Sequence, residues 1–318
     1  MENNFIKSVF TMLIGFGFLF YVYTFFDFED TDFRKVLNLV DIRLLFLGSF
    51  VYLLSHLVRS FRLILMSGDH GYSYRKLIIE QFKANGFNLL LPFKLGESYR
   101  LIAFKQFFGS YTNSFSLLLT ERFFDFFAII AFFCIGLLIS SADIKVFEDL
   151  FYISLGLFLI IALIFFVLKD ILLILQKNVI LKKPSKLNHS LIEISTSIIN
   201  SLDHISRTAK NKFLALSVIT LIIWGLEFSV FLIFYDFLQG SFDILILLGV
   251  AVALSTFLPN GPAGIGGVQL AFYIIGEILG SSEALNYSLI YSLFIFGSGL
   301  IVACLLFLFD GLRGIIKK

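Results

Sequence analysis

The sequence predicts an all-α polytopic membrane protein, with about six transmembrane helices and two re-entrant helical hairpins arranged as an inverted repeat. Three observations lead to this prediction. Of the 318 residues, 58% are apolar and only 15% are charged, whereas roughly a quarter of the residues in a soluble domain are charged. Several apolar windows reach about 18 residues, which is enough for a helix to cross a bilayer. Two further apolar regions are each interrupted by proline and glycine.

Six apolar segments have the length and hydropathy of complete membrane spans. They are residues 8–26, 42–64, 113–139, 150–172, 213–236 and 285–308. The first segment is not followed by a small-residue cleavage site, so we expect a retained span instead of a cleaved signal peptide.

Residues 77–108 and 244–281 are apolar but broken near their centres. The first region is interrupted between Pro92 and Gly96, and the second by the sequence LPNGPAGIGG at 258–267. Each half is about 12–16 residues long, too short to cross the membrane but suited to a re-entrant hairpin. Because non-helical backbone at that depth must be buried in protein or line a wet cavity, both breaks are candidate sites.

Lysine and arginine are unevenly distributed among the predicted loops. They gather after the second span, after the fourth span and at the C-terminus, as Arg59, Arg62, Arg75, Lys76, Lys177, Lys182, Lys183, Lys186, Arg313, Lys317 and Lys318. The opposite loops are acidic, as in DFEDTDF at 27–33. The positive-inside rule then places both termini in the cytoplasm, with the first hairpin entering from the cytoplasm and the second from outside. We expect a multi-pass protein of the plasma membrane.

The pair Arg59 and Arg62 closes the second span. The pattern favours positive-inside anchors whose long side chains snorkel to lipid phosphates.

The order span, span, hairpin, span occurs twice, with opposite topology. The stretches 42–139 and 213–308 are nearly equal in length, and we place repeat one at about 1–140 and repeat two at about 150–310 of a single transmembrane domain. Inverted repeats with broken segments in corresponding positions indicate a transporter with its site near the bilayer midplane. Between the repeats, 187–209 has helical apolar spacing, which suits an interfacial amphipathic helix or a connector packed on the cytoplasmic face.

The first break, LLLPFKLGESYR at 89–100, is loaded with charge. Pro92 should end the first half-helix, and Gly96 should permit an unusual backbone turn. The second half-helix then starts near Glu97 and Ser98, where free N–H groups and the positive end of the helix dipole favour an anion such as phosphate.

Two basic residues of the first break could strengthen such a site. Lys94 and Arg100 could add charge-assisted contacts to a lipid phosphate. Glu97 would cap the helix, pair with one of these cations, or contact a cationic head group. The alternative is that Glu97 and Arg100 only pair at i, i+3 on a cytoplasmic surface.

The third span carries charges in LLTERFFDFF at 118–127. Glu121 and Asp125 are four residues apart and share one helix face, and Arg122 is three residues from Asp125 and can pair with it. These side chains should face the protein interior, with the first hairpin as the expected neighbour. A structural ion pair and a role in substrate binding both remain open.

The second break, FLPNGPAGIGG, is rich in small and helix-breaking residues but lacks charge. Pro259 and Pro262 should interrupt the helix, and a half-helix should begin near Gly267. The candidate substrate-binding residues here are Asn260, Gly264, Gly266, Gly267 and Gln269. A nucleotide-binding loop would end in G-K-[ST], whereas Val268 follows the glycines here, so we do not expect nucleotide binding.

Signals for other functions are weak. The four histidines show no metal-ligand spacing, and no Ser-His-Asp or Cys-His set can be found. We therefore expect no catalytic residue, no metal, no cofactor and no nucleic-acid partner. An enzyme that uses paired carboxylates remains open, through Glu97, Glu121 and Asp125.

The same motifs resemble those of a known family. LLLPFKLGESYRL resembles its P-x-x-x-G-E-x-x-R element, ERFFD its E-R-x-x-D element, RSFR an earlier arginine pair, and LPNGPAGIGGVQ its glycine-rich element. The chain is thereby similar to the transmembrane region of the lysylphosphatidylglycerol synthase/flippase family, also called the flippase-like domain family, as a stand-alone member without the aminoacyl-transferase domain. The resemblance covers nearly the whole chain and implies a role for Pro92, Gly96, Glu97, Arg100, Glu121, Arg122, Asp125, Pro259 and Gly267.

The resemblance implies lipid translocation between leaflets. The expected protein moves a polar or charged head group along a path between the two hairpins, and its partner is a phospholipid or an aminoacylated or glycosylated lipid. Gln269 departs from the family, which commonly has glutamate there, so the charge of the family's residue is absent at this position. Two alternatives stay open: a membrane-embedded enzyme acting on a lipid or polyprenol carrier, and a non-catalytic partner of a separate transferase. Sequence does not predict the oligomeric state.

Overall fold

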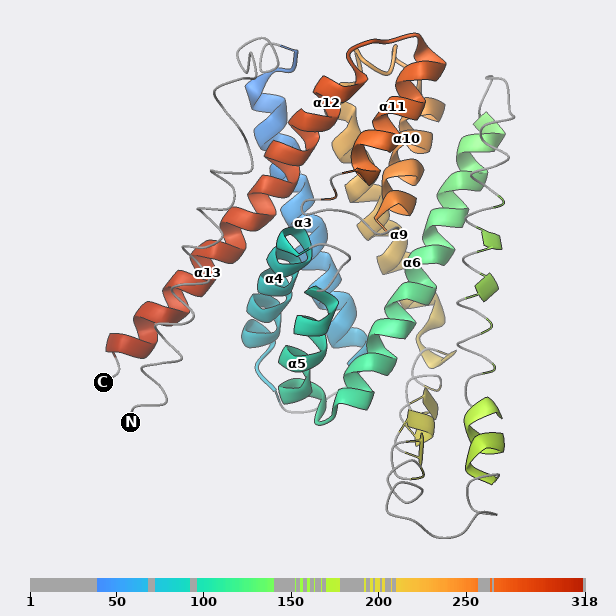
Figure 1. The fold of residues 1–318 in the computed structure, drawn as a ribbon, viewed down its shortest axis with the longest axis vertical. Helices are drawn as coiled ribbons and strands as arrows, with labels where there is room; N and C mark the ends of the chain where they lie inside the picture. The colour runs from blue at the N-terminus through green and yellow to red at the C-terminus, as the bar shows by residue number, and fades with distance from the viewer. Residues whose placement is uncertain are drawn as a thin grey trace. The chain divides into compact units, whose positions relative to one another are not determined.

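The computed structural model describes residues 39–67, 72–91, 96–139, 170–177, 210–256 and 266–316, together with Gly264 and short pieces between 152 and 207. Within these ranges the chain is helical and contains no strand (Figure 1). The predicted span 8–26 lies outside the described residues, and 150–172 and 187–209 are described only in part. Also outside lie Pro92, Lys94, Pro259, Asn260 and Pro262.

Four helical runs in this part of the chain are long and apolar enough to cross a membrane. They are α3 (Ile42–Ser67), α6 (Tyr111–Ile139), α9 (Phe213–Ser229) with the 3-10 turn η2 (Val230–Phe234), and α12 (Ala284–Ile290) continued by the π-helical turn η4 (Tyr291–Phe296) and α13 (Gly297–Ile316). Each begins within two residues of a span predicted from hydropathy. The protein is therefore a multi-pass helical membrane protein.

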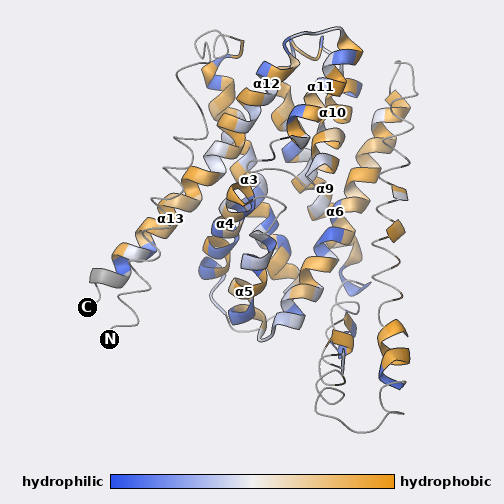
Figure 2. Ribbon diagram, viewed as in Figure 1, coloured by the Kyte–Doolittle hydropathy of each residue, from blue (hydrophilic) through white to orange (hydrophobic). Residues whose placement is uncertain are grey.

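The two interrupted apolar regions form pairs of shorter helices. The first pair is α4 (Tyr74–Leu90) and α5 (Gly96–Phe108), and the second is α10 (Phe242–Ser255) and α11 (Gly267–Leu279). Both apolar regions are interrupted where the sequence predicts, because α11 begins at the expected Gly267 and α5 begins at Gly96, one residue before the expected Glu97. Figure 2 shows hydrophilic residues along α4 and α5, whereas α10 is mostly hydrophobic.

The chain forms two compact units. Unit 1 consists of Met1–Leu57, Arg75–Arg100 and Gly225–Lys318, and unit 2 of Val58–Tyr74 and Leu101–Trp224. Each unit therefore takes residues from both predicted repeats. Helices α3, α5 and α9 each contribute one part to each unit.

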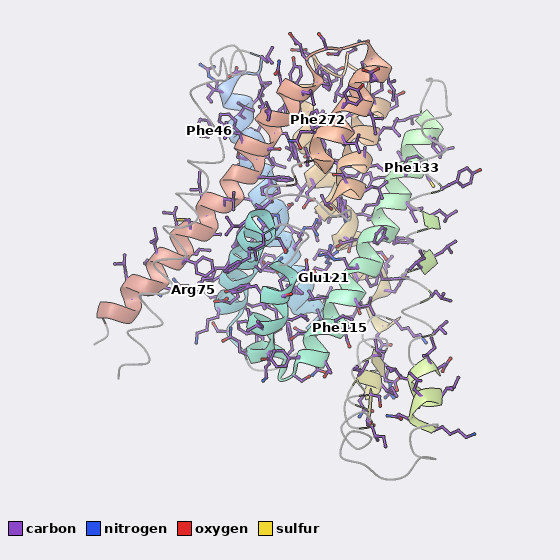
Figure 3. All side chains as sticks on the ribbon, in the orientation of Figure 1. Phe46, Arg75, Phe115, Glu121, Phe133 and Phe272 are labelled. Atoms are coloured by element: carbon purple, nitrogen blue, oxygen red, sulfur yellow. The ribbon has the colours of Figure 1, made fainter. Side chains whose placement is uncertain are left out.

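A cluster of aromatic rings occupies the core of unit 1 where α11 contacts α10 and α12. Its buried members are Phe231, Phe234, Phe237, Phe272, Tyr287 and Tyr291. Phe272 is labelled on α11 in Figure 3. The Phe231 and Tyr291 rings stack with centroids 5.1 Å apart, and those of Phe237 and Tyr287 with centroids 4.5 Å apart. Such pairs add about 0.5–1.5 kcal/mol each beyond area burial.

The first half of α3 packs closely on η4 and η2 within unit 1. A Cβ on Gly48 would lie 3.2 Å from an Ile295 side-chain carbon and 3.3 Å from one of Ile233. Next to it, the Ser49 hydroxyl donates a 3.1 Å hydrogen bond to the Phe294 carbonyl inside η4. The glycine thus permits α3 to approach the π-helical turn.

In unit 2, α6 packs against the first part of α9. The Phe213 ring contacts those of Phe124 and Phe127, with centroids 5.6 and 6.2 Å apart. At the end of α3, the Leu65 carbonyl accepts a 3.0 Å hydrogen bond from Lys212 Nζ. This bond satisfies one of the free carbonyls of a helix C-terminus.

Candidate functional site

Unit 2 contains a buried network of charges centred on Arg62 of α3. Arg62 Nη1 donates to Asp125 Oδ1 at 2.7 Å and to Thr220 Oγ1 at 3.1 Å, and Nη2 donates to Glu121 Oε1 at 2.9 Å. All four side chains are at most 2% exposed. The guanidinium fork therefore links α3, α6 and α9 through charge-assisted hydrogen bonds.

The carboxylate of Asp125 lies close to three guanidinium groups of this network. Besides Arg62, its carboxylate has Arg122 Nη1 at 3.3 Å and Arg59 Nη1 at 3.6 Å. It also accepts a 3.2 Å hydrogen bond from Trp224 Nε1, and the Arg59 guanidinium lies 5.2 Å from the centre of the Trp224 ring. The tryptophan thus binds an anion through its N–H group and a cation through its face.

The sequence spacing explains this geometry. Residues three or four apart on a helix share a face, so the arginines of RSFR on α3 can meet the two carboxylates of ERFFD on α6. Glu121, labelled on α6 in Figure 3, and Asp125 do share one face, as predicted, and both bind Arg62. The predicted pairing of Arg122 with Asp125 is also confirmed.

The prediction that Arg62 is an anchor snorkelling to lipid phosphates is wrong. Its side chain is 0% exposed and bound to two carboxylates. A buried guanidinium needs such partners because desolvation is costly. Arg59 also points into the network, with a side chain 12% exposed. The positive-inside argument for this loop therefore depends on Arg75 and Lys76, which are exposed.

The contacts within the network limit the chemistry that its carboxylates can perform. Among the described residues, the guanidinium groups of Arg59, Arg62 and Arg122 lie around the carboxylates of Glu121 and Asp125. Asp125 and Glu121 already accept hydrogen bonds from guanidinium groups, so neither is poised as a general base. The arrangement is suited to fixing the positions of the helices.

Unit 1 contains the charged residues of the first break. Arg100 Nη1 donates to Glu97 Oε2 and Nη2 donates to Gln81 Oε1, both at 3.3 Å. The predicted i, i+3 pair of Glu97 and Arg100 is thus confirmed. It is not the surface pair of the alternative, however, because Arg100 is only 4% exposed. Ser98, in contrast, is exposed and is not brought to this cluster.

Gly96 is explained by a close approach of α5 to α4. A Cβ at this position would lie 2.6 Å from Asn88 Cα, nearer than real Cβ contacts come. Its φ is not positive, so the predicted unusual turn at Gly96 is wrong. Asn88 Nδ2 in turn donates a 3.2 Å hydrogen bond to Glu97 Oε1. The glycine therefore brings the start of α5 within reach of the α4 side chains.

Unit 1 contains a second cluster of polar contacts, which the sequence did not predict. Lys83 Nζ donates to Glu80 Oε1 at 3.0 Å and to Asp310 Oδ2, and the Tyr99 hydroxyl donates to Glu80 Oε2 at 2.6 Å. The Lys83 ammonium also lies 5.1 Å from the centre of the Phe307 ring. These contacts join α4, α5 and α13. The i, i+3 spacing of Glu80 and Lys83 was the only local signal, because Asp310 is 227 residues away from Lys83.

Two glycines of the second break have a left-handed backbone. Gly264 and Gly266 have φ of +72° and +94°, a region that other residues rarely adopt. Gln269 Oε1 accepts a 2.8 Å hydrogen bond from the Gly266 N–H group and so caps its own helix, α11. Gln269 Nε2 also reaches Ser292 Oγ of η4 at 3.5 Å. Gly267 is buried at the first position of α11.

The described ends of both breaks lie against the junction of η4 and α13 in unit 1. On one side, a Cβ on Gly264 would come 3.1 Å from the Phe296 ring. On the other side, a Cβ on Gly299 would lie 3.0 Å from a side-chain carbon of Leu89, the last but one residue of α4, and 2.9 Å from Asn85 Nδ2. Tyr52 connects the two sides, since its hydroxyl accepts a 3.2 Å hydrogen bond from Asn85 and its ring lies 5.9 Å from that of Phe296.

Comparisons with known proteins agree with the sequence motifs. The family model described as the lysylphosphatidylglycerol synthase TM region matches residues 8–303. No curated protein and no solved structure matches the chain. In the part of the chain that the structure describes, no group of three or more histidine, cysteine, aspartate or glutamate side chains could hold a metal ion.

Proposed function

Because the chain belongs to the lysylphosphatidylglycerol synthase transmembrane-region family, we propose that it moves a lipid between the two leaflets of the membrane. The head group is polar or charged and passes along the two broken helix pairs, while the acyl tails stay in the bilayer. The lipid is a phospholipid or an aminoacylated or glycosylated lipid.

One observation carries this proposal. The described ends of both breaks lie against the same η4–α13 junction, through Gly264 and Phe296 on one side and Leu89 and Gly299 on the other. Broken helices are tolerated at membrane depth only where they are buried in protein or line a wet cavity. Two such breaks at one junction favour a polar path for a head group, as at the broken helices of known transporter folds.

The finer topology belongs to the same proposal. The chain has about six spans and two re-entrant hairpins in inverted repeats, with both termini in the cytoplasm and the plasma membrane as its location. The paired helices α4 and α5, of 17 and 13 residues, support a hairpin because each is shorter than the roughly 20 residues of a complete span.

Arg100 is the residue that we assign to the head-group phosphate. It is buried at the start of α5, where the positive end of the helix dipole also favours an anion. Glu97 holds the guanidinium in place, and a phosphate would replace Gln81 or share the fork with it. The Arg62 network in unit 2 fixes α3, α6 and α9 by buried ion pairs, and breaking such pairs costs much free energy.

The rival functions predict different products. A lipid-modifying enzyme needs a free base or nucleophile, and the carboxylates of Glu121 and Asp125 already accept hydrogen bonds from Arg62. A non-catalytic partner of a separate transferase would neither move nor modify lipid by itself.

Proteoliposomes that contain only this chain test the proposal. Labelled phospholipid placed in one leaflet should redistribute faster than in protein-free liposomes, and mass spectrometry should find its chemical structure unchanged. A new lipid species that disappears in Glu121→Gln would support the enzyme instead. If neither redistribution nor a new lipid species is observed, the result supports the partner role and contradicts the proposal.

A further inference from the structure

A polar pair in unit 1 lies deep in the predicted membrane region and has no role in the proposed head-group path. Ser55 of α3 and Glu227 of α9 come from two membrane-spanning helices, and the Ser55 hydroxyl lies 3.0 Å from Glu227 Oε1. Glu227 sits within the apolar sequence WGLEFSVFL of a 22-residue candidate span. An ionisable group at such a depth is costly and marks a candidate functional site.

The Ser55 hydroxyl has two neighbouring acceptors but only one hydrogen. Its oxygen lies 2.8 Å from the Tyr52 carbonyl oxygen as well as 3.0 Å from Glu227 Oε1. When Glu227 is ionised, the hydroxyl donates to the carboxylate. When Glu227 is protonated, its own O–H donates to Ser55 Oγ, and the Ser55 hydrogen turns to the Tyr52 carbonyl. The geometry therefore satisfies both charge states by rotation of a single hydroxyl.

In the described part of the chain, titratable groups near this pair lie on α3 and η4. From α3 they are Tyr52 and His56, whose rings lie edge to face with centroids 4.7 Å apart. From η4 it is the buried Tyr291, which interacts electrostatically with Glu227 and Tyr52. From α10 the neighbour is apolar, Gly249 against Phe228. Because tyrosine is neutral near pH 7, the carboxyl group of Glu227 is the acidic group of this cluster.

The pair is connected to both broken helix pairs. Tyr52, whose carbonyl is the second acceptor, holds Asn85 of α4 through its hydroxyl. Tyr291 begins the π-helical turn η4, and Phe296 at the other end of that turn lies against Gly264 of the second break. Such π-helical turns occur frequently at functional sites. A change of charge at Glu227 can therefore affect Tyr52 and η4, which contact the first and the second broken helix pair respectively.

We propose that Glu227 is a membrane-embedded proton-binding site and that the proton is the coupling ion for lipid movement. The coupling rests on the transport function proposed above. Uptake of one proton converts the carboxylate into a neutral acid, and release restores the carboxylate, so no other reactant is needed. A ligand shifts a conformational equilibrium by its differential affinity for the two states, and here the ligand is the proton.

Proton binding can be measured without transport. Infrared difference spectra of the purified protein between high and low pH should contain the carbonyl band of a protonated carboxylic acid. The band should be lost in Glu227→Gln and kept in Glu277→Gln, which changes an exposed carboxyl group on α11. A wild-type protein without this band, or a band that persists in Glu227→Gln, would overturn the proton site.

Coupling requires a second measurement in proteoliposomes. An imposed pH gradient should change the wild-type rate of lipid redistribution by at least about fivefold, the lower end of typical couplings between sites. Glu227→Gln should lose this response, and Glu277→Gln should retain it. A wild-type response that survives in Glu227→Gln overturns the coupling. A wild-type protein that moves no lipid contradicts the proposed function, whereas the infrared band still decides whether Glu227 binds a proton.

Ser55 acts in this scheme as a positioning residue. Ser55→Ala removes a hydrogen bond that is stronger to the ionised carboxylate than to the neutral acid, so it should raise the midpoint of the infrared titration by about one pH unit. Ser55→Thr keeps a hydroxyl and should restore the wild-type midpoint. Equal midpoints in wild type and Ser55→Ala would show that the hydroxyl does not serve the proton site.

Discussion

Arg62 Nη1 lies 2.7 Å from Asp125 Oδ1, and the two side chains are 0% and 1% exposed. The ion pair joins two membrane-spanning helices, α3 and α6, inside unit 2. Neither ion can reach water or a lipid head group from this position, so each depends on the other. The pair therefore makes the packing of these helices sensitive to single substitutions.

Replacing Arg62 with methionine should strongly destabilise the protein. The change leaves Glu121 without its 2.9 Å bond and removes the closest cation from Asp125. Breaking a buried ion pair costs about 3–5 kcal/mol, which corresponds to a fall of roughly 10 °C in the melting temperature. Thermal unfolding in detergent measures this directly.

The control for this prediction is Arg43→Met on the same helix. Arg43 is exposed, and its substitution should leave the melting temperature nearly unchanged. If Arg62→Met and Arg43→Met have the same melting temperature, the Arg62 network does not stabilise unit 2.

Gly96→Ala should separate the start of α5 from α4. The new Cβ would lie 2.6 Å from Asn88 Cα, a backbone atom that cannot move aside. Overpacking of this kind costs about 1–3 kcal/mol and should also weaken the bond from Asn88 to Glu97. The matched variant is Gly297→Ala, because a Cβ there meets nothing within 4 Å. Gly297→Ala should have a melting temperature at or above that of wild type. The prediction is wrong if Gly96→Ala melts at the same temperature as Gly297→Ala or at a higher one.

Gln269→Glu should preserve the cap of α11, whereas Gln269→Leu should remove it. A carboxylate can accept the Gly266 N–H bond just as the amide oxygen does at 2.8 Å, and its charge suits a helix N-terminus. Loss of the cap costs about 1 kcal/mol. Melting temperatures of the two variants give the comparison. A leucine variant as stable as wild type would mean that the Gln269 side chain is not needed as a cap.

Residues 75 and 105 should lie on the same side of the membrane if α4 and α5 form a re-entrant hairpin. Arg75 and Lys105 are exposed near the outer ends of these two helices. Single cysteines at these positions, in a chain with Cys134→Ala and Cys304→Ala, should react with an impermeant thiol reagent from the cytoplasmic side only. Labelling from opposite sides would make 77–108 a true span and remove the inverted repeat.

Sequence alone predicted the features that depend on local pattern. Hydropathy located four spans within two residues of their starts, and proline and glycine located the breaks that precede Gly96 and Gly267. Helical spacing placed Glu121 and Asp125 on one face, because such a relation needs only the 3.6-residue period. These signals are contained in short windows and survive without knowledge of the fold.

The features that sequence missed are contacts between distant segments. Arg62 binds Asp125 across 63 residues, and Ser55 meets Glu227 across 172. Near the end of a predicted span, an arginine has the same local pattern whether it snorkels to lipid or turns inward. The RSFR and ERFFD spacings were complementary, but which helices would meet depends on packing and not on either motif. Gly96 was assigned correctly to the break, yet its reason is close approach and not a turn.

Lipid redistribution per folded protein in Arg100→Ala tests most directly whether the first broken pair handles the head group. The wild-type chain should accelerate redistribution, and Arg100→Ala should reduce its rate by about 10–100-fold, since a charged hydrogen bond is worth roughly 1.5–3 kcal/mol. Arg100→Lys keeps the charge but loses the planar fork and should fall between them. Arg75→Ala, an exposed position on α4 labelled in Figure 3, should stay near wild type. Near-normal redistribution by a monodisperse, folded Arg100→Ala protein would contradict the phosphate role of Arg100.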